Sequence, residues 1–251
     1  PGMIKEDLKN PITASVSSTF PMSLMLLSTY IKPLIGTAAM YIWFFAIGLH
    51  IMLIIYFTMN FIVKFQFQKV FASYFVLYVG IVVSSVTAPA FEQFLVGTVA
   101  FWFGFSVLLA LLVLVTIRYV KFPDVPEPAQ PLICIYTAPT SLCVAGYVQS
   151  VTPKSRGFLL AIFALATVLY IFALVKALGL LKLKFYPSYA AFTFPFVISA
   201  IAAKQTMACL ANMQHPMPFL KYVVLFETIV ATLFMIYTFI RFMQFIFATD
   251  K

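Results

Sequence analysis

Charged residues are scarce in this chain. Lys, Arg, Asp and Glu together make up 9% of its 251 residues, whereas they make up about a quarter of a typical soluble domain. Hydrophobic residues make up 63%, which is more apolar surface than a soluble domain can bury. A membrane β-barrel would alternate apolar and polar residues, but the stretch from Leu108 to Ile117, LLALLVLVTI, is continuously apolar. The composition therefore predicts an all-α polytopic membrane protein.

Residue patterns for metal, covalent or nucleic-acid chemistry are also missing. The three cysteines, Cys134, Cys143 and Cys209, lie in apolar segments and share no metal-ligand spacing. No HExxH, GxSxG or Walker motif is present. The formal charge of +9 comes without a basic cluster interleaved with aromatic residues, so it indicates basic loops and contact with anionic lipid. We expect no enzyme activity, no metal or cofactor, and no nucleic-acid partner.

Eight apolar runs are long enough to cross a bilayer, which takes about twenty residues. Short connections make consecutive helices antiparallel neighbours, and we expect residues 1–251 to form a single transmembrane domain. A longer proline-rich link at 122–131 is predicted to be an extended loop. The approximate limits of the runs are 11–31, 37–63, 70–89, 95–120, 131–150, 157–181, 187–211 and 219–247.

The runs alternate in character along the chain. The first, third, fifth and seventh are shorter and richer in Ser, Thr, Ala, Gly and Pro, and the other four are longer and bulkier. This alternation predicts an inner set of helices that faces polar space and an outer set that faces lipid.

A short motif recurs in the inner runs. It reads Thr19-Phe20-Pro21, Thr137-Ala138-Pro139 and Thr193-Phe194-Pro195, and Leu77-Tyr78-Val79 falls at the matching place in the third run. The successive intervals, from Pro21 to Val79, from Val79 to Pro139 and from Pro139 to Pro195, are 58, 60 and 56 residues, which fits one helical hairpin per repeat. A proline inside a helix kinks it, so we expect kinked inner helices that line a channel, although prolines are common in membrane helices in general.

Lysine and arginine are unevenly divided between the two ends of the helices. Nine lie on the side of the first residue and four on the other, which predicts that both termini are cytoplasmic. The nine are Lys5, Lys9, Lys64, Lys69, Arg118, Lys121, Lys182, Lys184 and Lys251, and the four are Lys32, Lys154, Arg156 and Lys221.

The four inner runs contain no Asp or Glu. Cation and proton pathways usually use carboxylates inside the membrane, so a path without them suits an anion, attracted by hydroxyl dipoles and the basic field. Lys204 is either a fixed positive charge at the outer part of this path or a lysine that snorkels to the interface. The candidates for lining the path are Phe20, Pro21, Pro139, Thr193, Pro195 and Lys204.

Two further ionisable residues lie in the outer runs. We expect Glu227 to pair with a lysine of a neighbouring helix, and His50 to be a packing residue rather than a proton relay. Phe194 would place a ring beside the path, but phenylalanine is abundant, with 29 copies. On residue type alone, ordinary packing is the better interpretation of Phe194.

The order of these segments resembles the tellurite-resistance/dicarboxylate transporter family. The resemblance rests on AFTFPFVISAIAAK in the next-to-last run and on NPITASVSSTFPMSLMLL, from Asn10 to Leu27, and it covers essentially the whole chain. It implies ten transmembrane helices arranged as five hairpins around a central pore, often in a homotrimer. It also implies that a phenylalanine of the ninth helix occludes the pore, and Phe194 stands at that position.

The chain departs from that family pattern in two ways. We count eight runs, which match the third to tenth helices, so the first hairpin would precede Pro1; the absence of an initiator methionine at position 1 agrees with this. Either the chain is a fragment or something else closes the ring. The gate position is followed by Pro195, where other members can have glycine, and Lys204 need not be shared across the family.

We therefore expect a channel that conducts small anions through a pore gated by Phe194, in the bilayer of the cell, with a bacterial inner membrane as the expected location. Chloride, nitrate, sulfite, a dicarboxylate or tellurite could be the anion. The alternatives are a proton-coupled C4-dicarboxylate (malate) or sulfite carrier, or a tellurite-resistance exporter. A membrane-embedded enzyme would need clustered catalytic groups, and a scaffold would not need repeated kinks.

Overall fold

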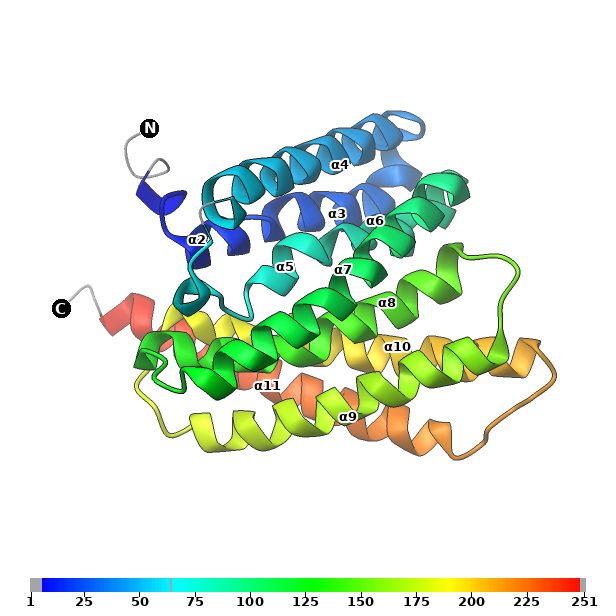
Figure 1. The fold of residues 1–251 in the computed structure, drawn as a ribbon. Helices are drawn as coiled ribbons and strands as arrows, with labels where there is room; N and C mark the ends of the chain where they lie inside the picture. The colour runs from blue at the N-terminus through cyan, green and yellow to red at the C-terminus, as the bar shows by residue number, and fades with distance from the viewer. Residues whose placement is uncertain (1–5, 64, 249–251) are drawn as a thin grey trace. The chain divides into compact units, whose positions relative to one another are not determined.

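The computed structural model describes residues 6–63 and 65–248. Lys5, Lys64 and Lys251, which entered the count of loop charges, lie outside the described residues. The chain divides into two compact units. Unit 1 comprises Pro1–Pro123 and Gln149–Pro153, and unit 2 comprises Asp124–Val148 and Lys154–Lys251. All regular secondary structure in the described residues is helical (Figure 1), which confirms the all-α polytopic fold predicted from the sequence.

The described residues of unit 1 form three long helices and several short ones. Its elements are α2 (Pro11–Val16), α3 (Thr19–Ile35), α4 (Ala38–Phe57), η1 (Thr58–Ile62), η2 (Phe67–Lys69), α5 (Tyr74–Tyr78), η3 (Gly80–Val82), α6 (Val83–Thr87), η4 (Ala88–Phe91) and α7 (Phe94–Lys121). Helix α3 lies along α4 and also contacts α6, while α7 packs on α5, η3 and α6 (Figure 1). A buried hydrogen bond of 2.7 Å from Trp43 Nε1 to Thr87 Oγ1 joins α4 to α6.

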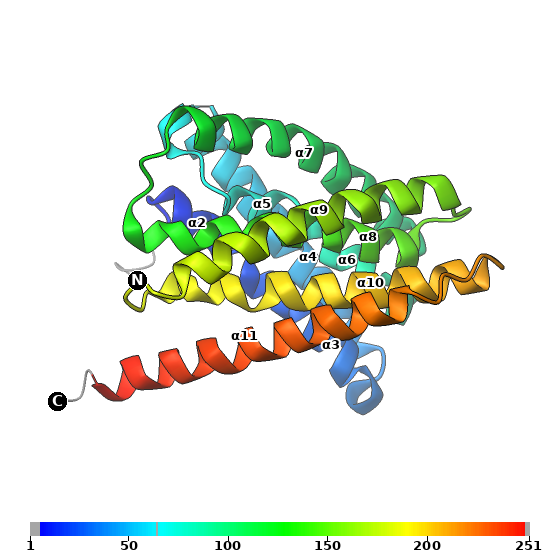
Figure 2. The same ribbon diagram turned by 90° about the horizontal axis from the view of Figure 1, so that it is seen from below.

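Unit 2 is built around α10 and α11. Its elements are η5 (Glu127–Tyr136), α8 (Thr137–Ser150, with its last two residues in unit 1), α9 (Arg156–Leu180), η6 (Pro187–Phe192), α10 (Phe194–Asn212) and α11 (Leu220–Ala248). Helices α10 and α11 lie alongside each other (Figure 2). Elements η5 and η6 pack together, and Tyr186 before η6 donates a 3.0 Å hydrogen bond to Glu127 Oε1. That bond raises the pKa of Tyr186 above its ordinary value.

Seven helical stretches in the described residues are long and apolar enough to cross a membrane. They are Ala38–Ile62, Tyr74–Phe91, Phe94–Lys121, Glu127–Ser150, Arg156–Leu180, Pro187–Asn212 and Leu220–Phe247. The first of the eight predicted runs is not among them, because it is divided into α2 and the 17-residue α3. At the division, the hydroxyls of Ser17 and Ser18 donate to the carbonyls of Ala14 and Ser15, a local bonding pattern that competes with a regular helix.

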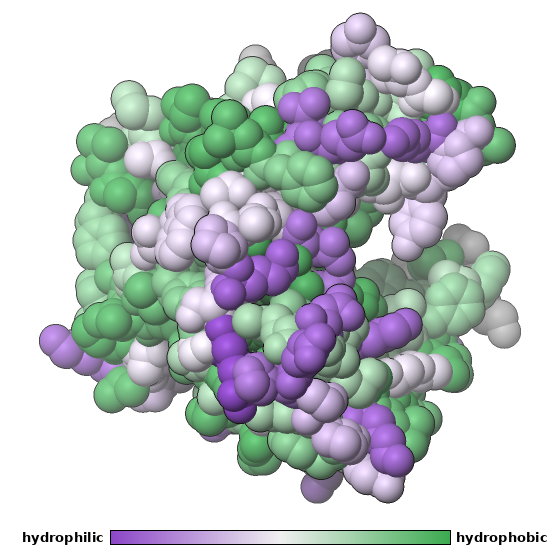
Figure 3. Space-filling view, turned by 90° about the vertical axis from the view of Figure 1, so that its right-hand side faces the viewer, coloured by the Kyte–Doolittle hydropathy of each residue, from purple (hydrophilic) through white to green (hydrophobic). Residues whose placement is uncertain are grey.

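Burial confirms the division into inner and outer helices for three of the four predicted inner runs, whereas in the first, 11–31, only 7 of 21 residues are buried. In the inner stretches Tyr74–Phe91, Glu127–Ser150 and Pro187–Asn212, 72%, 89% and 50% of the most apolar window is buried. In the four outer stretches the share is between 22% and 33%. Hydrophilic side chains gather at the helix ends seen in Figure 3, and hydrophobic side chains cover the flanks. The outer helices therefore present apolar surface suited to lipid.

The inner stretches are interrupted rather than simply kinked. Helix α8 begins at Thr137 directly after η5, and α10 begins at Phe194 directly after Thr193. Pro139 and Pro195 therefore lie in the first turn of a new helix, where a missing N–H costs nothing because that group has no intrahelical acceptor. The same holds for Pro21 in α3. The prediction that these prolines kink the middle of a helix was therefore wrong. The prediction of an extended link at 122–131 was also wrong over its second half, because η5 already begins at Glu127.

Close packing in unit 1 depends on Gly97 of α7. A Cβ at this position would overlap Ser150 Oγ and lie 2.8 Å from the Cβ of Ala88. Ser150 cannot easily yield, because its hydroxyl donates to the Ser85 carbonyl at 2.5 Å and its carbonyl accepts from Thr98 at 2.8 Å.

We expect Gly97→Ala to destabilise the protein by about 1–3 kcal/mol, the usual cost of overpacking. A lower melting temperature of the protein in detergent would show this. Gly48→Ala is the matched control, because a Cβ on Gly48 of α4 would have no neighbour within 4 Å. Equal melting temperatures for the two variants would contradict the packing described here.

Candidate functional site on helix α10

The start of α10 leaves one phenylalanine without an aromatic neighbour. Thr193 interrupts the span with φ −96° and ψ −93°, and its hydroxyl donates to the Ala190 carbonyl at 2.7 Å. Phe194, the first residue of α10, is half-buried. Among the described residues no ring packs against it. The flanking residues Phe192 and Phe196 are fully buried.

Phe192 and Phe196 are held by the same residue of α11. Their ring centroids lie 5.8 Å and 4.6 Å from that of Phe234. These contacts lock the two rings on the side of α10 that faces α11. Of the three phenylalanines around the interruption, only Phe194 can change rotamer without breaking an aromatic contact.

Lys204 lies on the same side of α10 as Phe194. The residues Phe194, Val197, Ile201 and Lys204 are separated by three, four and three positions, which is the spacing of one helix face. At 1.5 Å per residue, Lys204 is about 15 Å along the axis from Phe194. Lys204 is exposed, and it has no carboxylate partner in the part of the chain that the structure describes.

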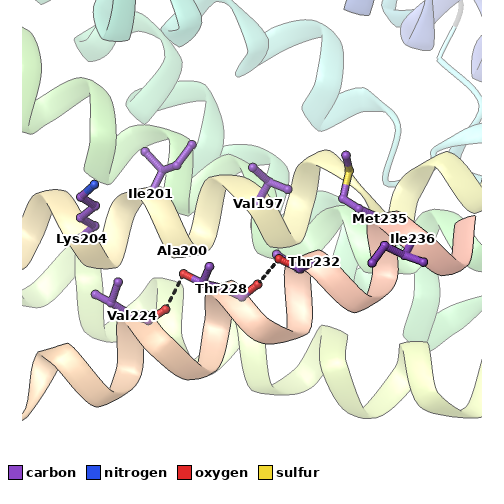
Figure 4. A pocket seen from close by; sticks show the side chains of 10 residues that line it. Val197, Ala200, Ile201, Lys204, Val224, Thr228, Thr232, Met235 and Ile236 are labelled. Atoms are coloured by element: carbon purple, nitrogen blue, oxygen red, sulfur yellow. Dashed lines mark hydrogen bonds between the residues drawn. The ribbon is translucent and has the colours of Figure 1, made fainter. Parts of the chain in front are cut away.

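A groove of about 370 Å³ runs between this side of α10 and α11 (Figure 4). Lys204 stands at one end, and Met235 and Ile236 stand at the other (Figure 4). The groove is lined by Val197, Ala200, Ile201 and Lys204 of α10 and by Val224, Thr228, Ala231, Thr232, Met235 and Ile236 of α11. It is therefore an apolar groove with a single positive charge.

The two threonines of the groove do not offer hydrogen-bond donors to an anion. Thr228 Oγ1 donates to the Val224 carbonyl at 2.6 Å, and Thr232 Oγ1 donates to the Thr228 carbonyl at 2.8 Å (Figure 4). A hydroxyl has one proton, and here the backbone accepts it. Attraction of an anion into this groove must therefore come from Lys204.

A second polar feature of α10 lies on another side of the helix. Ser199 Oγ is 2.8 Å from Thr137 Oγ1 and 2.8 Å from Ser141 Oγ, both of α8, and all three side chains are buried. At about 100° per residue, Ser199 is about 140° around the axis from Phe194. Sequence analysis did not find this cluster, because serine and threonine in the inner runs show no spacing that marks a meeting point.

His50 of α4 serves the interrupted backbone of the third inner run. Its Nε2 is 2.8 Å from the carbonyl oxygen of Leu77, one residue before the end of α5. Since a carbonyl can only accept, Nε2 carries the proton, and the buried Nδ1 has no partner among the described residues. This geometry favours the packing role over the proton relay.

Glu227 does not have the lysine partner that we expected. Its side chain is buried on α11, and no ion pair or hydrogen bond to Oε2 is formed within the described residues. The predicted pairing is therefore wrong there. The basic side chain of the adjacent helix, Lys204, belongs to the exposed groove, whereas Glu227 lies on the buried side of α11.

The remaining candidates for lining a path are divided between the units. Phe20 and Pro21 lie on α3 of unit 1, where Phe20 is exposed and Pro21 is buried. Pro139 lies on α8 in unit 2, and Thr193 and Pro195 flank Phe194 at the start of α10. The structure therefore brings together Thr193, Phe194 and Pro195, with Lys204 further along the same helix.

One comparison with known proteins identifies a family for this chain. A family model described as voltage-dependent anion channel matches residues 1–243, and no curated protein matches the chain. The family match confirms the resemblance to the tellurite-resistance/dicarboxylate transporters, whose members are channels or transporters. The chain thus belongs to the voltage-dependent anion channel family.

Proposed function

We propose that this protein conducts small anions across the membrane through a pore in which Phe194 is the gate. The observation that carries the proposal is the contrast among three phenylalanines. Phe192 and Phe196 pack on Phe234, while Phe194 stands half-buried at a helix start and has no aromatic contact with any described residue. A ring that is free to change rotamer at an interruption of the backbone is suited to opening and closing.

The blocking action of the ring follows from hydration. An anion that passes an apolar ring in a narrow pore sheds water without gaining a hydrogen bond, so the ring is a barrier until it moves aside. Lys204, on the same side of α10, raises the local concentration of anions. The inner runs contain no carboxylate that would repel them.

The second candidate function is a proton-coupled C4-dicarboxylate (malate) or sulfite carrier, or a tellurite-resistance exporter. One observation favours it: the buried Oε2 of Glu227 has no partner among the described residues, as expected of a carboxyl group that takes up and releases a proton. A carrier of this kind shows saturable flux that depends on a proton gradient. A channel shows flux that follows the electrochemical gradient of the anion alone.

The proposed oligomeric state follows from the family resemblance, and the proposed orientation follows from the loop charges. We propose that both units belong to one transmembrane domain of a homotrimer, with both chain ends on the cytoplasmic side of a bacterial inner membrane. Chloride, nitrate, sulfite, a dicarboxylate and tellurite are the anions to compare in flux measurements on the full-length protein.

Phe194→Ala should raise anion conductance about tenfold or more in bilayer recordings of the full-length protein, since tenfold corresponds to about 1.4 kcal/mol of barrier. Phe239→Ala is the control, because Phe239 is exposed on the outer helix α11. Unchanged conductance in a folded Phe194→Ala variant would remove the gate from the proposal.

Lys204→Met should lower anion conductance about two- to tenfold at low ionic strength and much less at 1 M salt, where the Debye length falls to about 3 Å. Lys204→Arg keeps the charge and should conduct like the wild type. An equal loss at low and high salt would show that Lys204 acts by packing and not by charge.

His50→Ala should destabilise the protein by about 1–3 kcal/mol, because the Leu77 carbonyl loses a buried donor. His50→Gln, which retains an N–H donor, should recover part of that loss. Neither change should alter how anion flux responds to a proton gradient. Loss of a proton-driven component in both variants, at normal melting temperature, would instead identify His50 as a relay.

A further inference from the structure

We propose that the buried hydroxyl cluster of Thr137, Ser141 and Ser199, between α8 and α10 of unit 2, binds a small monovalent anion such as chloride or nitrate. The inference rests on the proposed function, because it names the anion class that the pathway takes. Its basis is a surplus of hydrogen-bond donors at one buried place.

Counting protons shows the surplus. The cluster has three hydroxyls and therefore three protons. Ser199 makes two hydrogen bonds of 2.8 Å, one with Thr137 and one with Ser141, and each bond uses one proton. At least one O–H therefore has no acceptor within the described residues. Thr140, one helical turn from Thr137, is also buried and has a hydroxyl without a partner there.

Seven of the eight buried Ser and Thr hydroxyls among the described residues of unit 1 behave differently, because each donates to a backbone carbonyl; the exception is Ser73, which accepts from Ser15. Ser28 donates to the Met25 carbonyl at 2.6 Å, Ser84 to the Ile81 carbonyl at 2.7 Å, and Thr87 to the Val83 carbonyl at 2.8 Å. This back-bonding to the preceding turn is the usual arrangement of Ser and Thr in a helix. It leaves no proton for a ligand.

In unit 2, none of the buried Ser and Thr hydroxyls donates to a backbone carbonyl of the described residues. These residues are Thr137, Thr140, Ser141, Ser199, Thr206 and Thr238. Five of the six belong to the inner helices α8 and α10. On α8 and α10, which meet at Ser199, the buried hydroxyls therefore do not donate to backbone carbonyls of the described residues.

A donor surplus selects an anion over a cation. A cation would bind the lone pairs of the hydroxyls and would leave the same O–H protons without acceptors, whereas an anion accepts them.

The cluster also selects by ligand charge. Its members carry no formal charge, and the cost of removing an ion from water rises steeply with its charge. A dianion such as malate or sulfite would lose its hydration to neutral hydroxyls alone. A monovalent anion loses less hydration and can be held by a few O–H donors.

The side of α10 that bears Ser199 continues toward the end of the helix with small residues. Ala202, Ala203 and Thr206 follow at helical spacing, and the buried hydroxyl of Thr206 has no partner among the described residues. Thr206 lies two turns beyond Ser199, which makes it a second donor along the same side.

The test compares Ser199→Ala and Thr137→Val with the wild type in the full-length protein. Chloride efflux from liposomes is measured against chloride concentration, and the melting temperature in detergent is measured in sodium chloride and in sodium gluconate at equal ionic strength. We expect the half-saturating chloride concentration to rise about tenfold in each variant. We also expect the chloride-dependent rise in melting temperature, which reports binding to the folded state, to shrink.

Ser84→Ala is the matched control, because its hydroxyl is buried but donates to a carbonyl. It should leave both readouts unchanged. If Thr137→Val does not fold, Ser141→Ala takes its place. Variants that conduct with wild-type saturation and wild-type chloride stabilisation would overturn the cluster as an anion site while leaving the channel intact.

Two other results separate the cluster from the proposed function. A wild type that carries no anion, yet is stabilised by chloride through Ser199, would overturn the channel and retain the site. Stabilisation by malate or sulfite that equals that of chloride, and that is lost in Ser199→Ala, would overturn the monovalent selectivity.

Discussion

The need to satisfy backbone hydrogen bonds away from water governs this fold. Lipid offers no partner to a free N–H or C=O, so a helix that is interrupted within the membrane must find partners inside the protein. Each inner stretch meets this need with its own device. Ser17 and Ser18 bond to nearby carbonyls beside α2, His50 donates to Leu77 beside α5, and 3₁₀ segments run directly into α8 and toward α10.

The prolines explain where the interruptions fall. A proline has no N–H to give, so it is least costly in the first turn of a helix. Pro139 and Pro195 occupy that turn in α8 and α10. This placement makes the residue beside each proline part of a helix start. In α10 that residue is Phe194, whose ring projects from the point where the backbone departs most from a continuous helix.

Sequence analysis predicted the fold class and the alternation of inner and outer helices, because composition and periodicity are properties of long segments. The family followed from the resemblance of two segments, in the first and the next-to-last run. Sequence analysis did not predict which of Phe192, Phe194 and Phe196 is unpacked, since that depends on the position of Phe234 across the helix pair. It also gave Glu227 a lysine partner that the described residues do not provide. The acceptor to which a Ser or Thr hydroxyl donates depends on the side-chain rotamer, and a sequence pattern does not reveal the rotamer.

We propose that the two sides of α10 divide the work of selecting an anion. On the side that bears Phe194 and Lys204, the lysine charge would attract an anion and the apolar ring would resist its passage. Ser199 and Thr206 share the other, where neutral donors replace water without adding charge. A strong positive charge at the hydroxyl cluster would hold a dehydrated anion too tightly for rapid passage, since conduction needs binding weak enough to allow release. In the proposed arrangement, separating charge from donors would let one helix attract anions over a distance and still release them.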